Sequence, residues 1–401
     1  MLLFKKILSL LVVITSLASC SSDKVSGVDN FELSIDSLKD ANGFDKRENV
    51  FEYKVENNVV KIKTTDADFA SKVTELATKQ NLTTEVTALP EGKLAETPYG
   101  VIAQSVVNLR VGTSRAKGMA TQSLMGQQLQ IIEQDGDSQW YKVKIAQGYI
   151  AWIPRPSFIF LTNEESAKLK ALPKAMVTVP TTFAFNVNDN SQVVSDLVYG
   201  NVVVVEQKGK EWTLVVLPGD RKAVIKTSEL TDLAKWQQEA EFDKDFLIKY
   251  AYNYLGQPYM WGGNSFKGID CSGFSGAIYY AMGKFLPRDA SQQIKQGDVV
   301  EYSIVDKEVN GENHKLMVAD NLEVGDLLFF GNVKSKKVTH VAIWIGNNQY
   351  IHSSGKVHVT SVDPADDNYK EYLVESLLGV RRINGSKNLD KTIDLKAISI
   401  W

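Results

Sequence analysis

The pattern of apolar and polar residues changes several times along the chain. Residues 51–64 alternate around a Glu-Asn-Asn turn, which predicts a β-hairpin. Asp66 or Asp68 is placed to cap a helix over residues 69–82, and a further strand follows. We therefore expect residues 21–95 to form a polar tether and a small α+β segment that carries no evident chemistry.

Short alternating strands with frequent turn residues follow, and this stretch contains a faint repeat. Residues 124–140 and 197–212 share one order of features: a glycine, an apolar strand, Glu-Gln, a turn glycine and a tryptophan. Two small barrels explain this repeat better than one large sheet. We expect them over residues 96–160 and 161–235.

After the second barrel the pattern changes to mixed helices and strands. Asp243 is placed to cap one helix and Asp270 to cap another. A polar stretch covers residues 298–322, and a strand and a hairpin follow it. We expect an α+β unit over residues 236–384. Residues 385–401 form a tail whose hydrophobic end should dock on the folded chain.

Composition and charge describe an exported chain of several domains. The 401 residues are 44% hydrophobic, and the net charge of -3 argues against a nucleic-acid partner, because no basic excess neutralises phosphates. Residues 1–20 have the lysines and apolar segment of a secretory signal. Their ending, Leu-Ala-Ser-Cys, resembles a bacterial lipobox, which implies a lipidated Cys20. An ordinary signal peptide is the alternative. We expect a lipoprotein anchored to a bacterial membrane, periplasmic or facing the cell envelope.

Cys271 is the only other cysteine of the chain. Lipidation of Cys20 leaves it without an intramolecular disulfide partner. Cys271 follows the predicted cap Asp270, so it lies in the first turn of a helix. Unpaired backbone N–H groups and the helix dipole favour a thiolate there, which predicts a lowered thiol pKa. We expect a nucleophile, and an inert buried cysteine is the alternative.

A thiol nucleophile also needs a general base and a group that orients the base. The chain has four histidines: His314, His340, His352 and His358. His340 and His352 lie on the two strands of the predicted hairpin, and we assign them as base and orienting group. The other two are expected to be bystanders. A zinc site is the rival interpretation, but the spacing matches no closed zinc site, and we expect no metal or cofactor.

The turn of this hairpin decides whether the two imidazoles meet. A two-residue turn at the Asn-Asn pair would put Ile343 opposite His352 and the histidines on opposite faces. A three-residue loop that includes Gly346 instead puts Ala342 opposite His352, and both imidazoles share one face. Such loops need a left-handed residue at their end, which Asn348 tolerates. We predict the three-residue loop.

Four motifs then carry a family resemblance. They are Tyr-Met-Trp-Gly-Gly, Asp-Cys-Ser-Gly, Gly-Asp-Leu-Leu-Phe-Phe, and Thr-His-Val-Ala-Ile-Trp-Ile-Gly with a later Ile-His. In this order, over about residues 240–383, they resemble the NlpC family of bacterial cell-wall cysteine peptidases. The resemblance implies a papain-like α+β domain with a triad of Cys271, His340 and His352, and Tyr259 assisting at the oxyanion. It also implies hydrolysis of the γ-D-glutamyl–L-diamino acid bond of peptidoglycan stem peptides.

The domain order resembles a subgroup in which two bacterial SH3-like domains precede the peptidase. In that subgroup the first SH3-like domain restricts the substrate to stems with a free N-terminal L-Ala. The resemblance implies that five residues bind substrate: Asp270, Ser272, Trp261, Asp289 and Tyr149. The chain departs from the pattern at Gly118, where an acidic residue is expected.

Two other functions stay open. One is an amidase that cleaves the muramoyl–L-Ala bond, and the other is a non-catalytic lipoprotein whose barrels bind the wall. The intact cysteine and histidine pair argue against the second. The expected partners are peptidoglycan stem peptides and, through the lipid, the membrane, and we expect a monomer. Murein recycling and wall remodelling are both compatible with the sequence.

Overall fold

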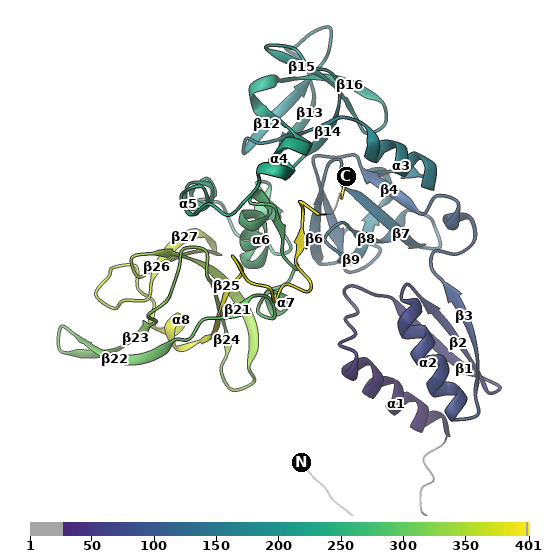
Figure 1. Cartoon of the computed structure of the whole chain (residues 1–401), viewed down its shortest axis with the longest axis horizontal. Coiled ribbons are helices and arrows are strands. Elements are labelled where there is room, and N and C mark those ends of the chain that lie inside the picture. The colour runs from purple at the N-terminus through teal and green to yellow at the C-terminus, as the bar shows by residue number, and fades with distance from the viewer. Residues whose placement is uncertain (1–26, 398–399) are drawn as a thin grey trace, which may run out of the picture.

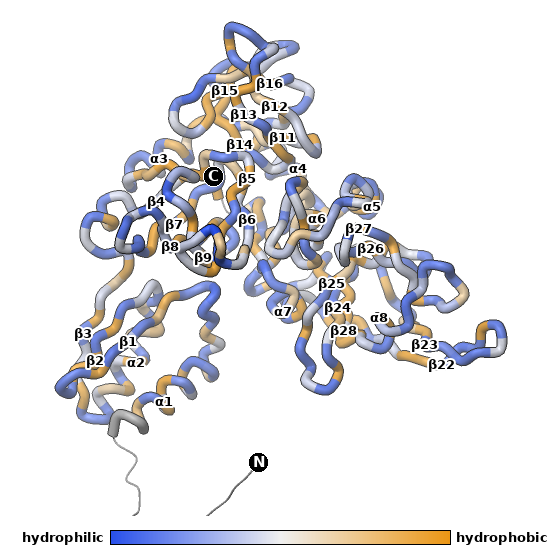
Figure 2. Tube along the Cα trace, turned by 180° about the vertical axis from the view of Figure 1, so that it is seen from behind, coloured by the Kyte–Doolittle hydropathy of each residue, from blue (hydrophilic) through white to orange (hydrophobic). Residues whose placement is uncertain are grey.

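The computed structural model describes residues 27–397 and 400–401. The predicted signal peptide and Cys20 lie outside the described residues. In the part described, no helix has the length and apolar character needed to cross a membrane. Hydrophobic residues concentrate in the sheets and in the helices that cover them, whereas the outer loops are hydrophilic (Figure 2). The helices and strands form four consecutive groups along the chain (Figure 1).

The first group is a small α+β unit, which we call the N-terminal unit. Its elements are α1 (Gly27–Ala41), β1 (Phe51–Glu56), β2 (Val59–Thr64), α2 (Ala67–Lys79), β3 (Thr83–Ala88) and the 3₁₀ turn η1 (Gly92–Ala95). The predicted hairpin is β1–β2, and β3 adds parallel to β2. Asp66 caps α2 by accepting a hydrogen bond from the Phe69 backbone N–H at 2.9 Å. Both helices pack on one hydrophobic core with the sheet.

The second and third groups are two seven-stranded antiparallel sheets. The first consists of β4 (Tyr99–Ile102), β5 (Val106–Arg110), β6 (Met119–Leu124), β7 (Gln128–Gln134), β8 (Trp140–Ile145), β9 (Ile150–Pro154), η2 (Arg155–Ser157) and β10 (Phe158–Leu161). After α3 (Asn163–Ala171), the second consists of β11 (Lys174–Val177), β12 (Thr181–Phe185), β13 (Val193–Val198), β14 (Val202–Gln207), β15 (Trp212–Leu217), β16 (Arg221–Lys226), η3 (Thr227–Glu229) and β17 (Leu230–Asp232).

The two sheets have the same topology. The spatial order of the first is β10-β4-β7-β8-β9-β5-β6, and that of the second, read in the matching direction, is β17-β11-β14-β15-β16-β12-β13. Every strand of the second sheet therefore corresponds to the strand seven places earlier in the chain. The repeat predicted from residues 124–140 and 197–212 thus extends over both whole sheets.

The fourth group is an α+β unit around a six-stranded antiparallel sheet of order β21-β28-β24-β25-β26-β27. Its helices are α4 (Leu233–Glu239), α5 (Lys244–Tyr252), α6 (Cys271–Ala281), α7 (Ala290–Gln293) and α8 (Glu371–Glu375). Its strands are β18 (Asn264–Ser265), β19 (Gly268–Ile269), β20 (Lys284–Phe285), β21 (Asp298–Val299), β22 (Ser303–Val309), β23 (Glu312–Val318), β24 (Leu327–Asn332), β25 (Lys337–Gly346), β26 (Gln349–Ser354), β27 (Lys356–Ser361), β28 (Leu377–Arg382) and β29 (Ile393–Asp394).

The six-stranded sheet is covered on both faces. Helix α6 packs on one face, against Val341, Ile343 and Ile351, and α8 closes a second core on the other face. The long polar stretch forms the β22–β23 hairpin, which packs on α8 and points outward (Figure 1). Helix α6 therefore lies between this sheet and the first seven-stranded sheet.

The C-terminal tail docks as its hydrophobic end predicts. Trp401 is fully buried, and its ring meets that of Trp236 edge-on at 6.1 Å. The carbonyl of Ile400 accepts a hydrogen bond from the Gln128 backbone N–H of the first seven-stranded sheet at 3.0 Å. The chain end therefore ties the fourth group to the first sheet.

We predict that Trp401→Ala lowers the free energy of unfolding by about 3–5 kcal/mol, because it removes a large buried side chain and leaves a cavity. Trp261→Ala is the matched control, since Trp261 is 71% exposed. Urea denaturation followed by circular dichroism compares the two variants. Equal losses of stability would contradict the docking role of Trp401.

Candidate active site

Cys271 is the first residue of α6, and it is 7% exposed. The N-cap Asp270 accepts a hydrogen bond from the Gly273 backbone N–H at 2.7 Å, which fixes the start of the helix. Gly273 is required by close approach, because a Cβ there would lie 2.0 Å from the carbonyl oxygen of Gly263. The backbone of Val341 in β25 lies close enough to the Cys271 thiol to act on its pKa.

The expected lowering of the thiol pKa is wrong. Burial, together with the nearby Asp270 carboxylate, raises the pKa of Cys271 to about 11. The backbone N–H groups of Val341 and Ser272 and the charge of Arg288 act in the opposite direction but do not outweigh this. Sequence position identified the helix start, but it did not reveal how completely the sulfur is removed from water.

The hairpin has the predicted register but not the predicted loop. The turn has two residues, Asn347 and Asn348, both left-handed with φ of 51° and 61°. Gly346 pairs with Gln349, and a β-bulge then shifts the register so that Ile343 pairs with Ile351. The bulge supplies the extra residue that the sequence interpretation had assigned to the loop. His340 and His352 consequently share one face.

The two imidazoles are in direct contact. His340 Nε2 lies 2.6 Å from His352 Nδ1. His352 is buried at 1% exposure, and its Nε2 lies 3.0 Å from Thr360 Oγ1 and 3.2 Å from His358 Nε2. His358, which the sequence placed among the bystanders, is therefore in contact with the histidine pair. β26 and β27 pair antiparallel with His352 directly opposite His358, a contact that the spacing of six residues did not reveal.

We call His340, His352 and His358, which contact one another in this order, the histidine row. A backbone carbonyl determines where the protons of this row lie. His358 Nδ1 lies 2.9 Å from the Lys356 carbonyl, which can only accept, so Nδ1 carries the proton. Whenever His358 carries no second proton, its Nε2 presents a lone pair, and His352 donates to it from its own Nε2. His352 Nδ1 is consequently an acceptor for the Nε2–H of His340. This leaves His340 Nδ1 unprotonated, as a base requires.

Burial keeps the histidine pair neutral. It lowers the pKa of His340 to about 4, and a proton added to His358 would lower it further by repulsion. It lowers the pKa of His352 to about 2, and a proton added to His340 or His358 would act in the same direction. Between these pKa values and the raised pKa of Cys271, the thiol and both imidazoles are neutral.

His314 is the one histidine that stays away from this row. It lies on the β22–β23 hairpin, where its Nδ1 is 3.5 Å from Glu371 of α8. Within the described ranges, 27–397 and 400–401, no group of three or more His, Cys, Asp or Glu side chains is arranged to hold a metal ion.

Tyr259 and Trp261 lie on the loop that leads into α6. The backbone of Tyr259 bridges to Ile269 and donates to the Gly355 carbonyl at 2.9 Å. Burial, then the charges of Cys271 and Asp270, raise the pKa of Tyr259, so its hydroxyl stays a donor beside the thiol. Trp261 is 71% exposed and presents a free aromatic face.

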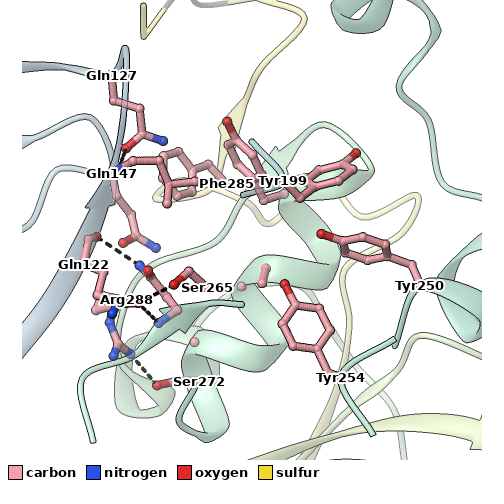
Figure 3. A pocket seen from close by; sticks show the side chains of 16 residues that line it. Gln122, Gln127, Gln147, Tyr199, Tyr250, Tyr254, Ser265, Ser272, Phe285 and Arg288 are labelled. Atoms are coloured by element: carbon pink, nitrogen blue, oxygen red, sulfur yellow. Dashed lines mark hydrogen bonds between the residues drawn. The ribbon is translucent and has the colours of Figure 1, made fainter. Parts of the chain in front are cut away.

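Arg288 is a site residue that the sequence interpretation missed. It is 3% exposed, and its guanidinium binds the Asp270 carboxylate at 2.7 and 3.1 Å. It also donates to Ser272 Oγ at 3.0 Å and to Thr121 Oγ1 of β6 at 3.0 Å (Figure 3 shows the Ser272 bond). Asp270 and Ser272, expected to bind substrate, are each 6% exposed, and Arg288 holds them in place. The only feature of the sequence that could have pointed to Arg288 was its position next to Asp289.

The expected substrate-binding residues Asp289 and Tyr149 do meet. Tyr149 Oη donates to Asp289 Oδ2 at 3.4 Å across the boundary between the first sheet and the fourth group. Burial, then the Asp289 charge, raises the pKa of Tyr149 to about 12. The same Oδ2 atom is 2.8 Å from Arg47 Nη1 of the N-terminal unit, a contact that the sequence did not predict. Gly118 lies in the exposed loop before β6.

The side of α6 that faces the two seven-stranded sheets carries a small cavity of about 30 Å³. It has tyrosines on one side and polar groups near Arg288 on the other (Figure 3). Gln122 of β6 accepts hydrogen bonds there from Ser265 Oγ at 2.8 Å and from the Asn264 backbone N–H at 2.9 Å. The cavity has room for about one water molecule. It is therefore a gap between packed surfaces and is too small to bind a substrate.

Comparison with known proteins identifies two domains. Residues 256–382 match the NlpC/P60 family, and residues 109–157 match the bacterial dipeptidyl-peptidase Sh3 domain. The resemblance expected from the four motifs is therefore confirmed.

Two curated relatives match most of the chain. A gamma-D-glutamyl-L-lysine dipeptidyl-peptidase of Bacillus cereus is 29% identical and covers 67% of this chain and 76% of its own. A protein of the same name from Bacillus subtilis is 26% identical, with 61% and 75% covered. The crystal structure of an NlpC/P60 family protein from Bacillus cereus superposes with a TM-score of 0.59 at 24% identity, over 71% of this chain and 99% of that one. This likeness shows a common fold.

The raised pKa of Cys271 predicts how the thiol titrates. Because a higher pKa means less thiolate at neutral pH, alkylation by iodoacetamide should keep accelerating with pH toward about 11. Mass spectrometry of the free protein over a pH series, with glutathione as the reference thiol, measures this. A plateau below the ordinary thiol pKa of about 8.5 would contradict it.

The row of histidines predicts a positioning role for His358. His358→Phe removes the lone pair that holds the proton on His352 Nε2, and Thr360 can then donate there instead. We expect kcat to fall about 10–100-fold with KM unchanged, a part of the ~10²–10⁴-fold that acid–base catalysis contributes. Kinetics on a peptidoglycan tripeptide measures this.

Two comparisons separate this role from a structural one. ¹⁵N NMR of the imidazoles should show His340 protonated at Nε2 in the wild type and a mixture of tautomers in His358→Phe. His314→Phe, outside the row, should change neither readout. An unchanged tautomer in His358→Phe would refute the assignment.

Proposed function

We propose that this chain, which contains an NlpC/P60 domain and a bacterial SH3 domain, is a cysteine peptidase that hydrolyses the γ-D-glutamyl–L-diamino acid bond of peptidoglycan stem peptides. The observation that carries the proposal is Cys271 at the start of a buried helix, with the His340–His352 pair at 2.6 Å on the adjoining strands. The names of the Bacillus relatives support the same bond. No cofactor enters the reaction.

In the proposed first step, Cys271 attacks the γ-carbonyl carbon of D-glutamate. Because thiol and imidazole both start neutral, the sulfur gives its proton to His340 Nδ1 as the carbon–sulfur bond forms. The positive charge on His340 is stabilised through His352, which is held by its hydrogen bonds to β27. The hydroxyl of Tyr259 and the free N–H groups at the start of α6 donate to the oxyanion.

The intermediate then collapses in two stages. The carbon–nitrogen bond breaks, and the amine of the diamino acid leaves with the proton from His340. The acyl group remains on Cys271 as a thioester. A water molecule gives a proton to His340 and attacks the thioester, and the sulfur departs and recovers that proton.

The proposal also includes two features of the architecture, a second SH3-like barrel and a papain-like peptidase core. The second seven-stranded sheet is a second SH3-like barrel, supported by the strand order that it shares with the first. The packing of α6 on β25 and β26 supports a papain-like peptidase core. The preference for fragments with a free N-terminal L-Ala, which the family resemblance implies, also belongs to the proposal, and the contact between Tyr149 and Asp289 supports it.

We also propose that the protein is an exported lipoprotein and a monomer, anchored through Cys20 with its catalytic part facing the cell envelope. The support is the lysine-led apolar segment and the Leu-Ala-Ser-Cys ending of residues 1–20. Such an anchor would keep the enzyme where stem peptides are released or remodelled.

Mass spectrometry of products tests the proposed bond. The wild-type protein should split the stem tripeptide into an N-terminal dipeptide and the free diamino acid. Release of the intact stem from a muramoyl peptide would indicate the amidase instead. Cys271→Ala should reduce turnover to background, whereas His314→Gln, a histidine outside the site, should retain it. Unchanged turnover in Cys271→Ala would remove the catalytic interpretation altogether.

A further inference from the structure

The two seven-stranded sheets and helix α3 line a second cavity, to which no residue of the proposed catalytic site contributes. Its volume is about 340 Å³, whereas the cavity beside α6 has about 30 Å³. Small-molecule sites in proteins span about 300–1,000 Å³, so this second cavity is large enough to hold a ligand. Helix α3, which links the two sheets, lies beside both of them (Figure 1). We call this space the inter-sheet cavity.

The walls of the inter-sheet cavity are largely apolar. Both sheets and the end of α3 contribute branched aliphatic side chains, among them Val101, Ile159, Leu161, Leu169, Leu172 and Val203. Leu161 and Val203 are buried, whereas Ile159 and Leu172 are each 39% exposed. These two large apolar side chains therefore stand at the rim of the cavity, where an apolar ligand would shield them from water.

Lys174, the first residue of β11, lies in the same wall and is only 8% exposed. Its Nζ donates to the backbone carbonyls of Lys170 and Leu172 at 2.9 and 3.1 Å. An ammonium group has three N–H donors, so one donor remains. Burial lowers the pKa of Lys174 to about 8, and no carboxylate of the described residues forms an ion pair with it. At neutral pH the amine is therefore charged and has no counter-charge.

The two carboxylates that line the inter-sheet cavity do not compensate this charge. Glu165 and Asp220 are both exposed, so water solvates them at the edge of the cavity. Glu165 also accepts a hydrogen bond from the Thr162 backbone N–H at 2.8 Å as part of the cap of α3. Of the described residues that are buried in the cavity wall, Lys174 is thus the only charged one. Because a buried charge is costly without an opposite charge, an anionic group of a ligand would be stabilised beside it.

We propose that the inter-sheet cavity is a binding site for an aliphatic carboxylate, with the carboxylate at Lys174 and the chain along the apolar walls. A carboxylate fits better than a phosphate group, because one cation with a single unused N–H does not compensate two negative charges. The chain would cover Ile159 and Leu172 at the rim. The site is independent of the proposed peptidase reaction, since no catalytic residue lines the cavity.

Isothermal titration calorimetry of the full-length protein with decanoate tests the site. Decanoate should bind about tenfold more tightly than octanoate, because two further methylene groups enter the apolar cavity. Lys174→Gln removes the positive charge and should weaken decanoate binding about tenfold or more. The same variant should bind decanol, which has the chain without the charge, as the wild type does. A general loss of structure would instead weaken both ligands.

Two further variants sharpen the result. Lys222→Gln is the matched control, because Lys222 is an exposed lysine of the second sheet that pairs with Glu206 and lies outside the cavity. It should leave the binding of both ligands unchanged. Val216→Trp fills the cavity from a position that is only partly buried, and it should abolish binding of both ligands with an unchanged circular dichroism spectrum.

The site is ruled out if decanoate does not bind the wild-type protein. It is also ruled out if Lys174→Gln or Val216→Trp binds decanoate as tightly as the wild type does. Cys271→Ala should bind decanoate with wild-type affinity, because the inter-sheet cavity does not include the thiol. The outcome for this site is therefore separate from the outcome for the peptidase.

Discussion

The buried ion pair between Asp270 and Arg288 is the contact on which the site depends. Asp270 caps α6 and also accepts from the Gly262 N–H, while Arg288 reaches Ser272 and the first seven-stranded sheet at Thr121. Both side chains are buried, with 2% of Arg288 and 9% of Asp270 exposed. A buried charge that loses its partner costs about 3–5 kcal/mol, so the pair holds the nucleophilic helix, its loop and the sheet in one arrangement.

This arrangement favours a reaction in which the Cys271 thiol gives its proton to His340 while its sulfur attacks the substrate. A sulfur buried next to a carboxylate does not hold a stable negative charge, and buried imidazoles do not hold a positive one. The hydrogen bonds of the histidine row determine which ring nitrogen of each histidine carries the proton before the reaction begins. The carbonyl of Lys356 determines the tautomer of His358, and hydrogen bonding carries that choice to His340. The base is thereby oriented before substrate binds.

The N-terminal unit contacts the α+β unit through side chains far apart in the sequence. It has its own core, and the loop between α1 and β1 supplies Arg47 to the Asp289 carboxylate at the start of α7. The first sheet contributes Tyr149 to the same carboxylate. Asp289 therefore joins three parts of the chain, namely the N-terminal unit, the first sheet and the α+β unit.

The sequence by itself determined the local features: the caps Asp66, Asp243 and Asp270, the β1–β2 hairpin, the repeat and the His340–His352 register. The caps and hairpins depend on residues close together in the sequence, where backbone geometry leaves few choices, and the repeat is visible as a pattern that recurs along the chain. Only the tertiary structure decided the thiol pKa and the contacts of Arg288, His358 and Arg47. Burial, and partners 18 residues away for Arg288 and 242 for Arg47, leave no trace in a local pattern. Long-range packing decides which charges are compensated, and no periodicity encodes it.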